Sequence, residues 1–131
     1  MAELFSSGDL AAIAEGFVWP VVTYAAGHVL VDVAFEDTLR SLTLLHGAAL
    51  RHGMTSTSAQ IVGYEGRLDQ RFSVDVMWEY LGKDGAPVAK GEIRYFCWFD
   101  PDDNVKIEMQ EFRYPAFPEV IAELQQPDTR H

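Results

Sequence analysis

Two ionisable side chains fall among apolar residues and are the candidates for proton transfer. His46 projects from the apolar face of a predicted helix over 36–52, and Glu111 continues the inward series of a predicted strand over 105–114. An imidazole can act as a general base or hydrogen-bond donor, and a carboxylate in an apolar pocket can move a proton. Each residue also has a structural interpretation: His46 as a core histidine bonded to a backbone carbonyl or water, and Glu111 as a residue at a frayed strand end or a partner of Arg113.

Aromatic side chains along the chain predict a ligand pocket. Rings supply flat apolar walls, and their hydroxyl and indole N–H groups supply a few directed hydrogen bonds, which together suit an apolar or ring-containing organic ligand. Each ring taken singly is explained as well by core filling, so the prediction rests on the whole set. The candidate ligand-binding residues are Trp19, Tyr24, Tyr64, Trp78, Tyr80, Tyr95 and Met109.

Other site chemistries find no support in the residue spacing. The four histidines form no His-x-His or His-x-x-x-His pair, and a single cysteine, Cys97, leaves no zinc cluster. The acidic turn at 100–103 lacks the ligand spacing of a calcium loop. Cys97 lies among aromatic residues, which predicts a buried, inert thiol. We therefore expect neither a metal nor a cofactor.

The totals describe one acidic, well-folded domain. The 131 residues are 48% hydrophobic, enough for a single core, and we expect one domain over 1–131 with its core at about 6–125 and a frayed tail at 126–131. A net charge of −10 disfavours nucleic acid and anionic membranes, which need clustered Lys and Arg. No segment approaches the roughly 20 apolar residues of a membrane span, and no basic start precedes an apolar run, so we expect a cytoplasmic protein.

The first third of the chain predicts a short helix and a hairpin. Ser6 is expected to cap the helix, with Asp9 at its third position in the manner of a capping box, and Pro20 to end it. β-branched runs at 21–24 and 29–33 flank a turn-like segment, which predicts a small hairpin.

The remainder predicts a helix followed by a sheet. An amphipathic helix over about 36–52 stops at Gly53. Two-residue alternation then predicts strands joined by short, turn-rich links, so neighbouring strands should be antiparallel. The predicted strands are 59–68, 71–81, 88–99 and 105–114, followed by a short helix at 119–125.

The alternation also divides the sheet into two faces. If Trp78 and Tyr80 point inward, the outer face mixes charge with large apolar groups, a composition that favours a subunit interface. The alternative is that the C-terminal segment covers this face. We expect a homodimer through the outer-face residues Met77, Arg94, Phe96 and Trp98.

The order of elements resembles the nuclear transport factor 2-like superfamily, in its SnoaL-like bacterial branch. The likeness spans about 6–114 and is carried by Trp19-Pro20 before a hairpin, a helix ending in His-Gly, the strand 74–81 leading into Lys83-Asp84-Gly85, and the strands 94–99 and 107–114. The resemblance implies an α+β fold, in which a cone-shaped, curved antiparallel or mixed sheet wraps around N-terminal helices (a cystatin-like roll) and encloses a cavity. It also implies dimers through the sheet.

The resemblance leaves several functions open, because this superfamily includes isomerases, dehydratases, cyclases, ligand binders and proteins without known activity. No catalytic residue of those enzymes aligns by motif with this chain. The leading hypothesis is a protein that binds a small molecule in an aromatic-lined pocket. The alternatives are a cofactor-independent isomerase, dehydratase or cyclase that uses His46 or Glu111 for proton transfer, and a non-catalytic dimeric interaction module.

Overall fold

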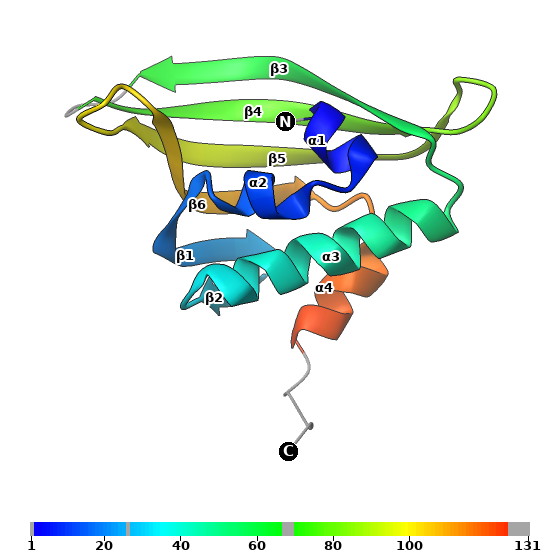
Figure 1. The fold of residues 1–131 in the computed structure, drawn as a ribbon, viewed down its shortest axis with the longest axis horizontal. Coiled ribbons are helices and arrows are strands. Elements are labelled where there is room, and N and C mark those ends of the chain that lie inside the picture. Colours follow the sequence, from blue (N-terminus) through cyan, green and yellow to red (C-terminus); the bar gives the residue numbers. More distant parts are fainter. Residues whose placement is uncertain (1, 26, 67–69, 126–131) are drawn as a thin grey trace.

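One curved, mixed β-sheet with helices against its concave side forms the molecule (Figure 1). The computed structural model describes residues 2–25, 27–66 and 70–125. The strand order is β2-β1-β6-β5-β4-β3, with β1 parallel to β6 and the other neighbours antiparallel. The strands are β1 (Phe17–Ala25), β2 (His28–Asp32), β3 (Ser56–Gly66), β4 (Arg71–Leu81), β5 (Pro87–Phe99) and β6 (Val105–Tyr114).

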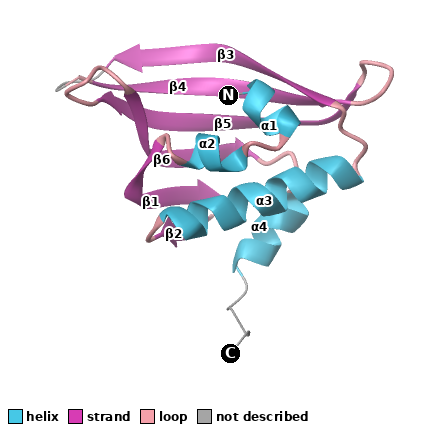
Figure 2. Cartoon of the chain, viewed as in Figure 1, coloured by secondary structure: helices cyan, strands magenta, loops and turns pink. Residues whose placement is uncertain are grey.

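Within the described residues, four helices complete the fold, namely α1 (Ala2–Ser7), α2 (Leu10–Ala14), α3 (Phe35–Arg51) and α4 (Pro118–Gln125). In the view of Figure 2, α1, α2 and α3 lie across one face of the sheet, and α4 lies beside α3. The side chains of His52, the C-cap of α3, and Glu119 of α4 join the two helices through a hydrogen bond of 3.1 Å between Nε2 and Oε1. The predicted α+β architecture with a curved, mixed sheet is confirmed.

The long hairpins follow the predicted alternation closely. Trp78 and Tyr80 are buried on the concave face. In the turn after β4, Gly85 has a φ of +79°, a conformation that glycine adopts without strain. Asp84 accepts a hydrogen bond from the backbone N–H of Ala86 and so closes this turn. The strand 71–81 has the predicted bounds, and its neighbours differ from prediction by at most a few residues at their ends.

The core lies between the concave face and the helices. Tyr80 is at its centre, with its ring centroid 5.7 Å from that of Phe5 on α1 and 4.9 Å from that of Phe117 before α4. Val21 and Val120 are fully buried on either side. Helix α1 and the segment before α4 are therefore both held against the end of β4 by aromatic packing.

The N-terminal helix prediction was wrong in detail. Two short helices replace the single one: Ser6 lies inside α1, where its hydroxyl bonds to the carbonyl of Ala2, and Gly8 at φ +83° breaks the chain direction. Asp9 is the N-cap of α2, and its carboxylate accepts from Ala12 N–H. Pro20 does not end a helix but lies within β1.

A β-bulge at Glu108 changes which residues of β6 face inward. Cys97 pairs with Ile107 but the next residue back, Phe96, pairs with Met109, so Glu108 is an extra residue in β6. An extra residue reverses the side-chain alternation of everything beyond it. Gln110 and Phe112 consequently face the concave side, and the prediction that Met109 and Glu111 do so was wrong.

Part of the chain remains outside this description. The predicted tail at 126–131 and residues 67–68 of the predicted strand 59–68 lie outside the described residues. Among those that are described, no helix combines the length and apolar character needed to cross a membrane.

Candidate functional site

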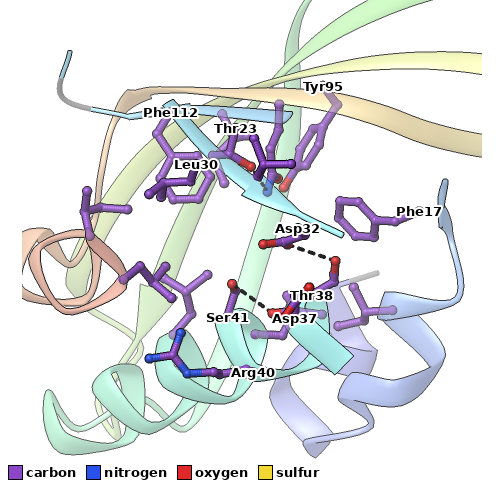
Figure 3. A pocket seen from close by; sticks show the side chains of 18 of the residues that line it. Phe17, Thr23, Leu30, Asp32, Asp37, Thr38, Arg40, Ser41, Tyr95 and Phe112 are labelled. Carbon is purple, nitrogen blue, oxygen red and sulfur yellow. Dashed lines mark hydrogen bonds between the residues drawn. The ribbon is translucent and has the colours of Figure 1, made fainter. Parts of the chain in front are cut away.

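A cavity of about 300 Å³ lies between the concave face of the sheet and helices α3 and α4 (Figure 3). Most of its walls are apolar, because the inward side chains of the sheet and the inner stripe of α3 meet there. The apolar and aromatic lining includes Phe5, Ile13, Phe17, Leu30, Leu42, Leu45, Trp78, Tyr80, Ile93, Tyr95, Phe112, Ile121 and Leu124. The polar lining is Thr23, Asp32, Asp37, Thr38, Arg40, Ser41 and Gln110.

Asp32 at the end of β2 is held in the cavity by a chain of two hydrogen bonds. The indole Nε1–H of Trp19 donates to the Thr38 hydroxyl at 2.9 Å, and that hydroxyl donates to Asp32 Oδ2 at 2.9 Å. An indole N–H can only donate, so the Thr38 hydroxyl accepts from it and its own proton is directed at Asp32. Figure 3 shows the Asp32 carboxylate between the sheet and Thr38. Thr38 is 2% exposed, which keeps this geometry fixed.

Burial is the main influence on the pKa of Asp32. Its pKa is raised above the ordinary value chiefly by desolvation, with Asp37 adding to the rise, while the Thr38 hydrogen bond and Arg40 act in the opposite direction. The carboxylate is half-buried, and only its Oδ2 accepts a hydrogen bond from the described residues. Asp32 is thus an under-compensated negative group facing an apolar space.

Asp37 and Arg40, the other charged residues of the lining, are differently placed. Asp37 Oδ2 accepts from the backbone N–H groups of Val33 and Ala34, at 2.9 and 3.1 Å, and so fastens the start of α3. Arg40 is exposed at the rim. Asp37 is exposed and caps the start of α3, so Asp32 is the half-buried carboxylate of the lining.

Two hydrogen-bonded pairs occupy the sheet side of the cavity. Trp78 Nε1–H donates to the Tyr95 hydroxyl at 3.0 Å, and Gln110 Nε2–H donates to the Thr23 hydroxyl at 3.1 Å. Because Tyr95 accepts from a donor-only indole, its own O–H is available to donate. Burial raises the pKa of both Tyr80 and Tyr95, so both phenols stay protonated near neutral pH.

Four of the seven predicted ligand-binding residues lie at or behind the cavity. Trp78, Tyr80 and Tyr95 line it, and Trp19 lies behind Thr38 as its hydrogen-bond donor. Tyr24 and Met109 project from the convex face, where Tyr24 pairs in register with Glu111 and Met109 with Phe96. Tyr64 is 70% exposed at the far end of β3 and stacks on Phe72.

Glu111, one of the two predicted proton-transfer residues, lies on the convex face. Its Oε1 is 3.8 Å from Arg94 Nη1 and 3.9 Å from Arg113 Nη1, so the structural interpretation made from the sequence describes its surroundings. Arg94 also donates to both carboxylate oxygens of Asp75, at 2.6 and 3.2 Å. The bulge at Glu108 is the physical reason that Glu111 faces away from the cavity.

His46, the other predicted proton-transfer residue, lies beneath the α1–α2 turn. Its ring makes an edge contact with Phe5, with centroids 5.3 Å apart, and it lies against Gly8. Nε2 is buried and has no hydrogen-bond partner among the described residues. His46 is absent from the cavity lining, because it occupies the side of α3 that faces α1 and α2.

Cys97 is a free, buried cysteine. Burial raises the pKa of the Cys97 thiol to about 11, in agreement with the predicted inert cysteine. Within the described ranges, no group of three or more His, Cys, Asp or Glu side chains is arranged to hold a metal ion.

The sequence pattern indicates the inward position of Asp32, although this residue belongs to no recognised motif. In the predicted hairpin, Asp32 alternates with Val31 and shares a face with Leu30, so an inward Leu30 implies an inward Asp32. The inward position of Gln110 is not indicated by the sequence pattern, because it depends on the bulge two residues earlier.

Comparison with known proteins identifies the fold. No family model matches the chain, and no curated protein matches it either. Among solved structures, an NTF-2-like protein of unknown function from Shewanella oneidensis has a TM-score of 0.62 at 18% identity, covering 84% of this chain and 87% of that one.

Two further neighbours extend this finding. The protein Aln2 from a Streptomyces species has a TM-score of 0.63 at 14% identity over 95% of this chain and 87% of its own. A ketosteroid isomerase-like protein from Erwinia carotovora atroseptica has a TM-score of 0.58 at 12% identity, over 86% and 88% respectively. At these identities the likeness establishes the fold and leaves the activity open.

Proposed function

We propose that this chain, which has the nuclear transport factor 2-like fold, binds a small, mostly apolar, ring-containing organic molecule in the cavity between sheet and helices. The observation that carries the proposal is the cavity of about 300 Å³ whose apolar walls surround a few converging polar groups. Small-molecule sites in proteins commonly combine these two properties.

The polar groups suit recognition better than they suit core stability. Tyr95 presents an O–H donor, Gln110 and Thr23 form a second polar position, and Asp32 presents an acceptor oxygen. A core under selection for stability alone would exclude a half-buried carboxylate, since its desolvation costs free energy. The ring walls of Trp78 and Tyr80 supply the apolar contact area.

A thermal-shift titration with 2-naphthol tests the proposal. Leu42 lines the cavity and Thr43, the next residue on α3, is exposed, so Leu42→Trp fills the site while Thr43→Trp adds the same side chain outside it. We expect 2-naphthol to raise the Tm of the wild type and of Thr43→Trp with increasing concentration, since only the folded state binds. Leu42→Trp should lose this response.

An equal response of both tryptophan variants would place the naphthol elsewhere and refute the proposal. A wild-type Tm that stays constant up to the solubility limit of 2-naphthol would count against it as well. Circular dichroism of Leu42→Trp before the titration shows that the variant is folded.

A proton-transfer enzyme is a second candidate, favoured by the presence of Asp32 and the Tyr95 hydroxyl in one cavity. In this version Asp32, rather than His46 or Glu111, is the base, and Tyr95 donates to the developing oxyanion. The likeness to a ketosteroid isomerase-like protein agrees with such chemistry. Deuterium exchange into the α-carbons of 2-tetralone, followed by NMR, should be accelerated by the wild type and not by Asp32→Asn. No acceleration by the wild type would remove this candidate.

A further inference from the structure

We propose that the ligand of this cavity carries a basic amine next to its ring system, and that the Asp32 carboxylate is the group that binds the amine. This inference rests on the proposed binding function and adds the chemical class of the ligand. It is argued from three properties of the charged groups that line the cavity: their charge, their hydrogen bonds and their exposure.

The charged groups of the lining differ in their exposure and in their hydrogen bonds. Among the described residues, Asp32, Asp37 and Arg40 are the charged members, with a formal sum of −1. Asp37 is committed to the backbone at the start of α3, and the Arg40 guanidinium is exposed at the rim with no ion pair in the described part of the chain. Asp32 is half-buried and its Oδ1 accepts no hydrogen bond from the described residues, so it is the anionic acceptor inside the cavity.

The position of Asp32 is fixed before any ligand arrives. The Thr38 hydroxyl accepts a hydrogen bond from the indole N–H of Trp19. Its own proton is therefore donated to Asp32 Oδ2. An acceptor whose orientation is already set loses little entropy when a cation binds. Thr38 and Trp19 are positioning residues in this scheme, and Asp32 makes the contact.

An ammonium group compensates this carboxylate better than the alternatives do. Charge-assisted hydrogen bonds are about twice as strong as neutral ones, and the apolar surroundings of Asp32 strengthen the attraction. A ligand carboxylate would face Asp32 and Asp37 together, and a neutral alcohol would add no positive charge to the exposed Arg40 as compensation for Asp32. The rings of Phe17 and Tyr95, which lie in the same cavity, can accommodate the apolar part of the molecule.

Three probes with one ring system test the inference: 2-naphthylmethylamine, 2-naphthylmethanol and 2-naphthoate. Their dissociation constants are measured by calorimetry at neutral pH and low salt. We expect the amine to bind at least about tenfold tighter than the alcohol, and the carboxylate to bind weakest. This order would support an anionic recognition group in an apolar site.

Two variants assign the preference to Asp32. Asp32→Asn keeps the size of the side chain and its acceptor oxygen, and should weaken amine binding at least about tenfold while leaving the alcohol within about threefold. Glu36→Gln removes the same charge from an exposed residue of α3 outside the cavity lining, and should leave both constants nearly unchanged. Alcohol binding by Asp32→Asn shows that its cavity is intact.

The outcomes distinguish a failure of this inference from a failure of the proposed binding function. Equal binding of amine and alcohol, or an amine preference that survives in Asp32→Asn, overturns the inference and leaves the binding function standing. A preference reduced equally by Glu36→Gln also overturns it, since it would report general attraction to an acidic protein. If no probe binds, both the inference and the binding function fail.

Discussion

Asp32 and Asp75 show how the surroundings of one residue type produce opposite behaviour. Burial raises the pKa of Asp32 in the cavity, whereas the hydrogen bond from Arg94 lowers the pKa of Asp75 on the convex face. Asp75 is held in an ion-paired surface, where its charge is compensated. The charge of Asp32 lacks such a partner among the described residues, which is a property typical of functional carboxylates.

The first prediction is that Asp32→Asn stabilises the protein at neutral pH. A raised pKa in the folded state means that protonated Asp32 favours folding. That contribution is complete below the pKa of the unfolded state and is lost as pH rises through the pKa of the folded state. Asn mimics the protonated form, so the variant should have the higher Tm at pH 7, with a difference that shrinks toward pH 4.

Asp75→Asn provides the matched control for this measurement. Its lowered pKa stabilises the fold above the pKa of the unfolded state and loses that effect as pH falls. Asp75→Asn should therefore be less stable than the wild type at pH 7, again with a difference that shrinks in acid. Thermal melts of both variants across this pH range check the two signs, and an Asp32→Asn variant less stable at pH 7 would contradict the account.

At the scale of the element, the β-bulge in β6 decides which side chains reach the cavity. The strand is central in the sheet, paired with β1 and β5, so its alternation is constrained on both edges. The extra residue Glu108 lets Ile107 and Gln110 both face inward, although three positions separate them. Without it, Met109 and Glu111 would face the cavity, as simple alternation predicts.

The second prediction concerns deletion of Glu108. Removing the extra residue forces either Ile107 or the pair Gln110 and Phe112 out of the core, and we expect a loss of about 3–5 kcal/mol or more, comparable to truncating a buried aromatic. Deletion of Val62, the extra residue of a similar irregularity in the edge strand β3, should cost much less because Val62 and Ile61 are exposed. Urea denaturation measures both, and equal losses would contradict the role assigned to Glu108.

The sequence could predict the elements because each carries a local physical pattern. Alternation in 71–81, the turn at Asp84-Gly85 and the amphipathic helix before Gly53 depend on neighbouring residues only. The placement of Glu111, Met109 and Gln110 could not be predicted in this way, because a bulge depends on how two strands meet. Asp32 was accessible to the same reasoning but carried no motif, and its significance appears only when Thr38 and Trp19 are brought beside it.

At the scale of the whole molecule, the convex face stays the predicted dimer interface. Met77, Arg94, Phe96 and Trp98 lie on this face, alongside the Asp75–Arg94 and Glu92–Arg113 ion pairs. Aromatic residues, Met and Arg are enriched in interfaces, and charged groups on the two surfaces can set the register of two copies.

The third prediction is that the protein sediments at twice the 14.7 kDa mass of one chain. Trp98→Ala should weaken the dimer by about 2 kcal/mol or more if this ring is a central contact. Tyr64→Ala, which removes an exposed ring from the concave side, should leave the mass unchanged. Analytical ultracentrifugation measures all three proteins, and a monomeric wild type would refute the interface.

The most direct test of the central claim is a methyl NMR map of where 2-naphthylmethylamine binds. Ile93 and Ile121 line the cavity, whereas Ile61 is exposed on β3 outside it, so the protein contains its own reference methyl group. The account predicts saturable shifts at Ile93 and Ile121 with an unmoved Ile61. Shifts at Ile61 alone, or no saturable shift at any of the three, would contradict the assignment of this cavity as a binding site.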